Sequence, residues 1–175
     1  NQYLIPSTGK LDWINLNALM LSRVDQSLKT TAKNLTPCPG TLTGDIYLDG
    51  KNGLRDSINR PGKKTIWNLP TGCNLTLSNI TFHGIGTIIN PTGSLTVSGQ
   101  VAPPSLAPHT FGYVSKNGAA ITLNEGLDIT NMAFYTSGKT TIKPIENEAD
   151  CGALTISGAN YLAKIISQDM VFPTP

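Results

Sequence analysis

The sequence predicts a mainly β protein whose equivalent strands stack in parallel, preceded by one α-helix. Two observations predict the strands: Thr, Ser, Asn and Gly are abundant while only 14% of residues are charged, and a six-residue pattern recurs four times. This composition favours short strands and many turns, whereas helices favour Ala, Glu and Lys. The helix is predicted by one periodic apolar stripe near the N-terminus.

That stripe runs from Leu11 to about Thr31 and recurs at three- and four-residue steps. Its members are Leu11, Ile14, Ala18, Leu21, Val24 and Leu28. A seven-residue recurrence within the stripe is compatible with a seam between subunits. Residues 36–40, Thr-Pro-Cys-Pro-Gly, then end the segment. We therefore expect a helical cap or oligomerisation segment over residues 1–40 and a β domain over residues 41–175.

The recurring pattern occupies Asn74–Asn79, Ser94–Gly99, Gly126–Asn131 and Ala153–Gly158. Alternate residues of a strand face the same side, so the Leu and aliphatic positions should form one apolar stack while the Thr positions face outward. The apolar positions are Leu75 and Leu77, Leu95 and Val97, Leu127 and Ile129, and Leu154 and Ile156. The last position is always Asn or Gly, which tolerate the left-handed backbone of a sharp corner.

Two arrangements can accommodate these strands. Repeats spaced 20 to 32 residues apart, as here, stack as solenoids. A sandwich of hairpins is the alternative, but it needs regular tight-turn signals, and Asn-Gly occurs only at Asn52 and Asn117. Parallel stacking is the better fit.

The segment Asn74-Leu-Thr-Leu-Ser-Asn-Ile-Thr-Phe-His-Gly84 resembles a coil of the right-handed parallel β-helices of the pectate-lyase-like superfamily. Residues 54–59 and 61–72 are similar to the first part of many such folds, in which a short helix precedes a Gly-containing turn and a strand. The resemblance covers roughly residues 42–172. It implies a right-handed parallel β-helix, a fold shared by phage tailspikes and tail fibres, polysaccharide lyases and hydrolases, and secreted bacterial adhesins.

Charge and cysteine content limit the possible partners. A net charge of +2 without clustered Lys or Arg argues against nucleic acid and anionic membranes, and no apolar stretch is long enough for membrane insertion. The cysteines, Cys38, Cys73 and Cys151, are odd in number and widely spaced, so we expect ordinary reduced or buried thiols. The chain starts without Met, and we expect a processed product or part of a longer chain.

Catalytic and metal-binding patterns are missing from the sequence. His83 and His109 are the only histidines and have no partner at ligand spacing, so we expect neither a metal site nor another cofactor. Asp128 is the single acid in the outward column, whereas glycoside cleavage needs two carboxyl groups. These observations favour a protein that is not an enzyme.

Binding residues are predicted instead. Trp67 should face outward, where it could stack on a sugar ring or be covered by the preceding helix. Phe111 and Tyr113 follow His109 on a proline-stiffened segment, which suits recognition because little entropy is lost on binding. Together with Asp128 in the outward column, these residues form the candidate glycan-binding set.

The function that the resemblance implies is a structural and receptor-binding module of a phage tail. It would be a trimer within the virion that contacts a bacterial surface polysaccharide. A secreted bacterial adhesin is one alternative, and a polysaccharide lyase or glycoside hydrolase is another.

Overall fold

The computed structural model describes residues 31–57, 63–105, 109–117, 119–124, 128–136, 138–143, 154–157 and 160–164, together with Ser22, Asp25, Gln26 and Lys29. Most of the helix predicted over residues 11–31 lies outside this part of the chain, and its few described residues do not make up a helical element. That helix stays a prediction. The rest is a parallel β-solenoid of about three turns, so the predicted solenoid fold is confirmed and its right hand stays a prediction.

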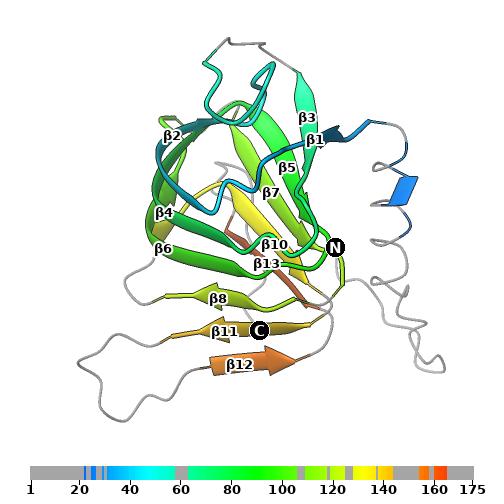
Figure 1. The fold of residues 1–175 in the computed structure, drawn as a ribbon. Coiled ribbons are helices and arrows are strands. Elements are labelled where there is room, and N and C mark those ends of the chain that lie inside the picture. Colours follow the sequence, from blue (N-terminus) through cyan, green and yellow to red (C-terminus); the bar gives the residue numbers. More distant parts are fainter. Residues whose placement is uncertain are drawn as a thin grey trace, which may run out of the picture.

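Two sheets form the walls of the solenoid (Figure 1). Sheet A contains, in spatial order, β1 (Lys33–Asn34), β3 (Lys64–Asn68), β5 (Ile85–Asn90), β7 (Thr110–Ser115), β10 (Met132–Thr136) and β13 (Asn160–Lys164). Sheet B contains β12 (Leu154–Ser157), β11 (Lys139–Ile142), β8 (Ile121–Leu123), β6 (Leu95–Ala102), β4 (Leu75–His83) and β2 (Thr41–Tyr47), while β9 (Asp128–Ile129) pairs with β6. From β2 to β11 the chain passes back and forth between the two sheets, with β8 and β9 as the one pair of consecutive strands in the same sheet, so each turn adds a rung to both walls.

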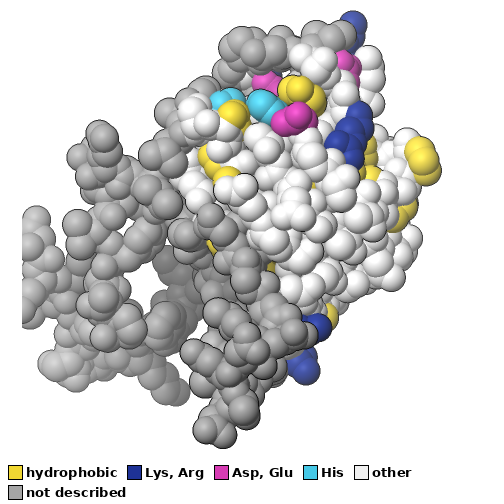
Figure 2. Space-filling view, turned by 90° about the vertical axis from the view of Figure 1, so that its left-hand side faces the viewer, with side chains coloured by type: hydrophobic (Ala, Val, Ile, Leu, Met, Phe, Trp, Pro, Cys, Tyr) yellow, Lys and Arg dark blue, Asp and Glu magenta, His cyan; other side chains and the backbone are white. Residues whose placement is uncertain are grey.

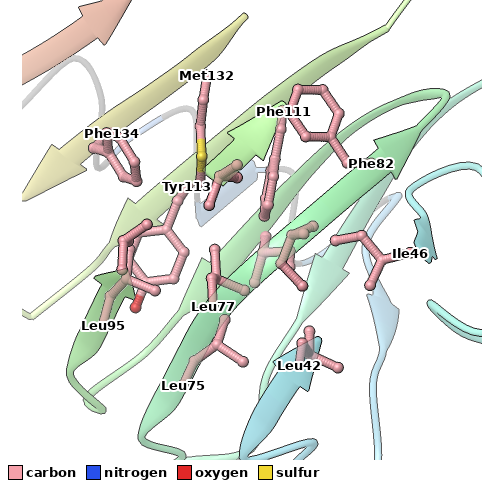
Figure 3. Close-up of a cluster of buried hydrophobic side chains, with 14 of the residues drawn as sticks. Leu42, Ile46, Leu75, Leu77, Phe82, Leu95, Phe111, Tyr113, Met132 and Phe134 are labelled. Carbon is pink, nitrogen blue, oxygen red and sulfur yellow. The ribbon is translucent and has the colours of Figure 1, made fainter. Parts of the chain in front are cut away.

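The core is built from columns of apolar side chains that the rungs place above one another. In sheet B one column is Leu42, Leu77, Val97 and Leu123, and its neighbour is Leu75, Leu95 and Ile121. All are at most 5% exposed. Figure 3 shows Leu42, Leu75, Leu77 and Leu95 of these columns facing the aromatic residues Phe111 and Tyr113 of sheet A. The rings of Phe82 in sheet B and Phe111 in sheet A pack edge to face at 5.6 Å. Burying such columns is the main stabilising term.

The corners follow the chemistry that the sequence predicted. Asn79, Gly99 and Asn131 all have positive φ angles, of 51°, 66° and 53°. Asn and Gly adopt this conformation at the lowest cost, which confirms the prediction for these three positions. The fourth, Gly158, lies outside the described residues.

The predicted register is right for two copies and wrong for two. Leu75 pairs with Leu95 as expected, but the partner of Leu95 in the next rung is Ile121, and Asp128 and Ile129 pair with Gln100 and Val101. The segment that continues the stack is Ala120-Ile-Thr-Leu, which resembles the repeat less closely than residues 126–131 do. The predicted third copy therefore lies one strand too late in the sequence. A rung at Thr41-Leu-Thr was missed for the same reason.

The fourth copy does not stack in parallel. β12 runs antiparallel to β11, and β13 runs antiparallel to β10. An antiparallel strand needs only a short connection to its neighbour, whereas a parallel one needs a full crossover. The predicted parallel stack therefore ends at β10 and β11.

Two features close the end of the solenoid that contains β2. Cys38 and Cys73 form a disulfide with Cα atoms 5.5 Å apart, which corrects the prediction of reduced thiols for this pair. The guanidinium of Arg55 donates hydrogen bonds of 2.7 Å to the carbonyl oxygens of Thr43 and Asp45 on the edge strand β2. Of residues 54–59, for which the resemblance implied a short helix, the structure describes 54–57, where Leu54 and Arg55 form a turn and no helix is present.

Candidate functional site

Trp67 faces the core, so its predicted outward orientation is wrong. Its side chain is 1% exposed, and its indole Nε1–H donates a hydrogen bond of 2.8 Å to the Leu48 carbonyl. Strand β3 has the phase opposite to the predicted one, since Ile66 is the residue that faces away from the core. A tryptophan whose polar atom is satisfied in the core is a structural residue.

Phe111 and Tyr113 are also buried, at 0% and 1% exposure. They were predicted on a recognition loop, but residues 110–115 form β7 in the middle of sheet A. Alternation along this strand turns both rings inward. Burial raises the pKa of the Tyr113 hydroxyl, which therefore stays neutral. Neither ring can stack on a ligand at the surface.

His109 is the predicted site residue that lies at the surface with described contacts. Its Nδ1 accepts a hydrogen bond of 2.8 Å from the backbone N–H of Gly84. Burial lowers the pKa of this imidazole, and His83 lowers it further. The carboxylate of Asp49 acts in the opposite direction. The neutral form, in which Nδ1 can accept, is therefore favoured.

His83 lies next to His109, and Asp45 and Tyr47 in turn contact His83. The His83 ring lies 6.0 Å from the His109 ring in an edge-to-face arrangement, and its other neighbour is the Tyr47 ring, stacked at 4.7 Å. His83 Nε2 lies 3.0 Å from Asp45 Oδ1, and these side chains are 28% and 62% exposed. We call Asp45, Tyr47, His83 and His109 the histidine rim. Figure 2 shows histidine and acidic side chains together at one edge of the drawn face.

The backbone explains how the rim forms. Tyr47 and His83 are paired residues at the ends of β2 and β4, and alternation places Asp45 on the same face as Tyr47. Gly84 then turns the chain toward sheet A with a φ of 79°. The buried Asp49 fills the space where a side chain of Gly84 would lie. The rim therefore belongs to a rigid corner.

A second polar feature covers the outer face of sheet B. Threonines occupy one column in successive rungs, where Thr41 pairs with Thr76, Thr76 with Thr96, Thr96 with Thr122 and Thr122 with Thr141. We call Thr41, Thr76, Thr96, Thr122 and Thr141 the threonine ladder. In the next strand the backbone of Thr155 pairs with that of Thr141. A second polar column lies two residues after the ladder threonine in each of β2, β4 and β6. Its members are Thr43, Ser78 and Ser98.

Asp128 lies on neither feature. Its backbone pairs with Gln100, and the backbone N–H of Gln100 donates to the Asn79 side chain, so this position is at the corner between the ladder and the rim. The structure therefore separates the five predicted residues. Trp67, Phe111 and Tyr113 are in the core. His109 is in the rim, and the backbone of Asp128 is at the corner, with its side chain outside the described part.

Sequence reasoning missed Asp45 and Tyr47 and left His83 without a partner. A usable signal was present, since Thr41-Leu-Thr resembles Thr76-Leu-Ser. Aligning those segments would have placed Tyr47 opposite Phe82, one residue from His83. The register shifts by one residue between Thr43 and Gly44, where Asn79 of β4 has no partner in β2, and this shift hides the match.

The described residues contain neither a metal-ligand cluster nor a membrane-spanning helix. Within them, no group of three or more His, Cys, Asp or Glu side chains is placed to hold a metal ion. In the same part of the chain, no helix is both long and apolar enough to cross a membrane.

No protein-family model, no curated protein and no solved structure matches this chain. A functional proposal for this chain therefore rests on the geometry of the rim and the ladder.

Proposed function

We propose that this chain is a non-enzymatic receptor-binding module, of the kind carried on phage tails, that contacts a bacterial surface glycan through the histidine rim. The observation that carries the proposal is the stack of the Tyr47 and His83 rings beside the exposed carboxylate of Asp45. Ligand sites combine apolar or aromatic surface with a few placed polar groups, and sugars present both apolar ring faces and hydroxyl groups.

Each rim group has a role in this proposal. The Asp45 carboxylate accepts hydrogen bonds from sugar hydroxyls, and charged acceptors give stronger bonds than neutral ones. The Tyr47 and His83 rings supply a surface for the apolar face of a sugar. His109, held by the Gly84 N–H through Nδ1, presents Nε2 as a donor in its neutral form.

The test is a titration of the chain with a panel of bacterial polysaccharides by calorimetry. Replacing Asp45 by Asn keeps the shape and removes the charge, and we expect it to weaken glycan binding about tenfold or more. The matched control is Asp25→Asn, because Asp25 pairs with Lys116 at the opposite end of β7 from His109. Equal affinities of the Asp45→Asn and Asp25→Asn variants would disprove a site at the rim. Release of reducing ends from any glycan would instead favour a hydrolase.

The Cys38–Cys73 disulfide supports a second candidate, a secreted bacterial adhesin that uses the same rim. Disulfides persist in extracellular and periplasmic proteins and are rare in the cytosol, where phage tails assemble. Mass spectrometry of the protein from its native source distinguishes the two. A disulfide formed during export favours the adhesin, whereas reduced thiols in assembled particles favour the phage tail.

We further propose that the module is a homotrimer, because the predicted N-terminal segment has apolar residues at seven-residue spacing. Sedimentation equilibrium should then give three times the chain mass of 18.6 kDa. A single-chain mass at all concentrations would exclude the trimer and leave the rim proposal intact.

A further inference from the structure

We propose that the threonine ladder is an ice-binding face, a function separate from glycan binding at the rim. The starting observation is that five described rungs of sheet B carry Thr in the same outward column. The flanking side chains, such as Leu75, Leu77, Leu95 and Val97, are at most 1% exposed, so this column is the one that faces outward.

The ladder is not a general consequence of strand propensity. Threonine favours strands everywhere, so propensity alone would place it on both walls. The corresponding outward column of sheet A is Ile66, Thr87, Gly112 and Ala133. That column contains one threonine in four rungs, whereas every described rung of the ladder has one. The repetition is therefore specific to one face, while on the other wall Ile66 packs against the buried side chains of Ile89, Val114 and Tyr135.

The spacing of the ladder is set by the backbone. Neighbouring strands lie about 4.8 Å apart, and alternate residues along a strand lie about 6.6 Å apart. With Thr43, Ser78 and Ser98 as the second column, the hydroxyl groups form a two-dimensional grid. The crystal faces of ice present water oxygens in two-dimensional grids with comparable repeats, whereas a single glycan chain repeats along one direction only.

The chemistry of the ladder suits ice better than a charged partner. Each threonine offers a hydroxyl that donates and accepts hydrogen bonds and an apolar methyl group that forms no hydrogen bond with water. The two columns have no charged side chain in the described rungs from β2 to β8. Figure 2 likewise shows a broad area without charged or hydrophobic side chains beside the rim.

The threonine ladder is held rigidly by its backbone and side-chain geometry. A β-branched side chain on a strand has few rotamers, and the parallel ladder of backbone hydrogen bonds fixes the rungs relative to one another. Thr76 and Thr96 lie in the middle of the ladder, with a paired rung on either side. The grid therefore exists before binding, and little entropy is lost when ice is bound.

The test uses the full chain in three measurements: the shape of ice crystals grown in its presence, the gap between melting and freezing temperatures, and the inhibition of ice recrystallisation. We expect faceted crystals and inhibited recrystallisation with the wild type. Thr96→Tyr should abolish both effects, because a bulky ring breaks the flat grid. Thr110→Tyr is the matched control, since Thr110 is an exposed residue of sheet A, and it should behave as wild type.

Thr96→Val serves as a second, isosteric variant in case the tyrosine variant fails to fold, with folding checked by circular dichroism. It should weaken recrystallisation inhibition several-fold. Unfaceted crystals and normal recrystallisation with the wild type would overturn the proposal, as would equal activity of the Thr96 and Thr110 variants. Loss of glycan binding in Thr96→Val with unchanged ice activity would also overturn it, by assigning the ladder to the glycan. Asp45→Asn should leave ice activity unchanged, so the two proposals can fail independently.

Discussion

Gly84 is the residue on which the histidine rim depends most directly. It has a φ of 79°, its N–H holds His109, and a Cβ built on it would lie 2.4 Å from the Asp49 carboxylate carbon. Two separate physical reasons therefore require glycine here. One is the positive φ, and the other is the close approach of Asp49.

These two reasons can be separated by a matched pair of substitutions. Gly72 has a similar φ of 77°, but a Cβ added there would meet no atom within 4 Å, so Gly72→Ala should cost only the left-handed strain of about 1–2 kcal/mol. Gly84→Ala should cost about 1–3 kcal/mol more, because Asp49 must move. Urea unfolding of both variants measures the difference. Equal destabilisation would show that Asp49 is free to shift.

The imidazole of His109 predicts a pH dependence of stability. Its pKa is lowered in the folded protein, chiefly by burial and then by His83, while Asp49 opposes the shift. The unfolded chain therefore binds more protons as the pH falls through the ordinary histidine pKa of 6.5, so stability is full above that value and decreases below it.

The urea concentration at the unfolding midpoint should accordingly decrease when the pH is lowered from 7.5 to 5.5 (about one unit either side of the ordinary value). In His109→Gln this fall should be smaller, since the titrating group is gone. An unchanged pH dependence in that variant would assign the effect to other groups.

At the scale of elements, the first rung is the one that needs extra support. β2 is an edge strand, and free strand edges invite pairing with other chains. Arg55 occupies two of its edge carbonyls, and the disulfide ties the segment before β2 to the segment before β4. The covalent bond and the guanidinium thus stabilise the end of the solenoid, where a rung has only one neighbour.

Removing the disulfide should destabilise the fold substantially. Cys38 and Cys73 are 35 residues apart, and closing a loop of that length is worth about 2–4 kcal/mol. The Cys38→Ser/Cys73→Ser variant should unfold at correspondingly lower denaturant concentration. Reductant should lower the wild-type midpoint to a similar value and leave that of the double variant unchanged. Insensitivity of the wild type to reductant would contradict a stabilising role.

At the scale of the whole molecule, the solenoid is a stack in which each rung contacts its neighbours. In such folds stability is close to a sum of rung and interface contributions, so inner rungs make more contacts than terminal ones. The apolar column Leu42, Leu77, Val97 and Leu123 spans four rungs and offers a direct comparison within one column.

Leu77→Ala should cost about 2–5 kcal/mol, because it leaves a cavity between two rungs. Leu42→Ala, at the terminal rung of the same column, should cost less, although both side chains are at most 4% exposed. Thermal and urea unfolding compare the two variants. A larger cost at Leu42 would show that the cap region contributes more than stacking does.

Local chemistry was sufficient to predict part of this structure. Alternation in Asn74–Asn79 and Ser94–Gly99 predicted which side chains face inward, and the Asn and Gly positions predicted left-handed corners, because both depend on the backbone of a single segment. The outward column of threonines was also visible in the sequence. Its continuation through Thr41, Thr122 and Thr141 was not, since those rungs are less similar and differently spaced.

Tertiary structure decided the phase of β3, the antiparallel direction of β12 and β13, and the meeting of Asp45, Tyr47, His83 and His109. A strand with apolar residues on both faces, such as the one containing Ile66 and Trp67, has no preferred orientation until a core forms around it. The rim residues are separated by up to 64 positions in the sequence (45 to 109), and only the stacking of rungs brings them together. The sequence alone therefore determined the repeating unit, while packing between the units determined the candidate sites.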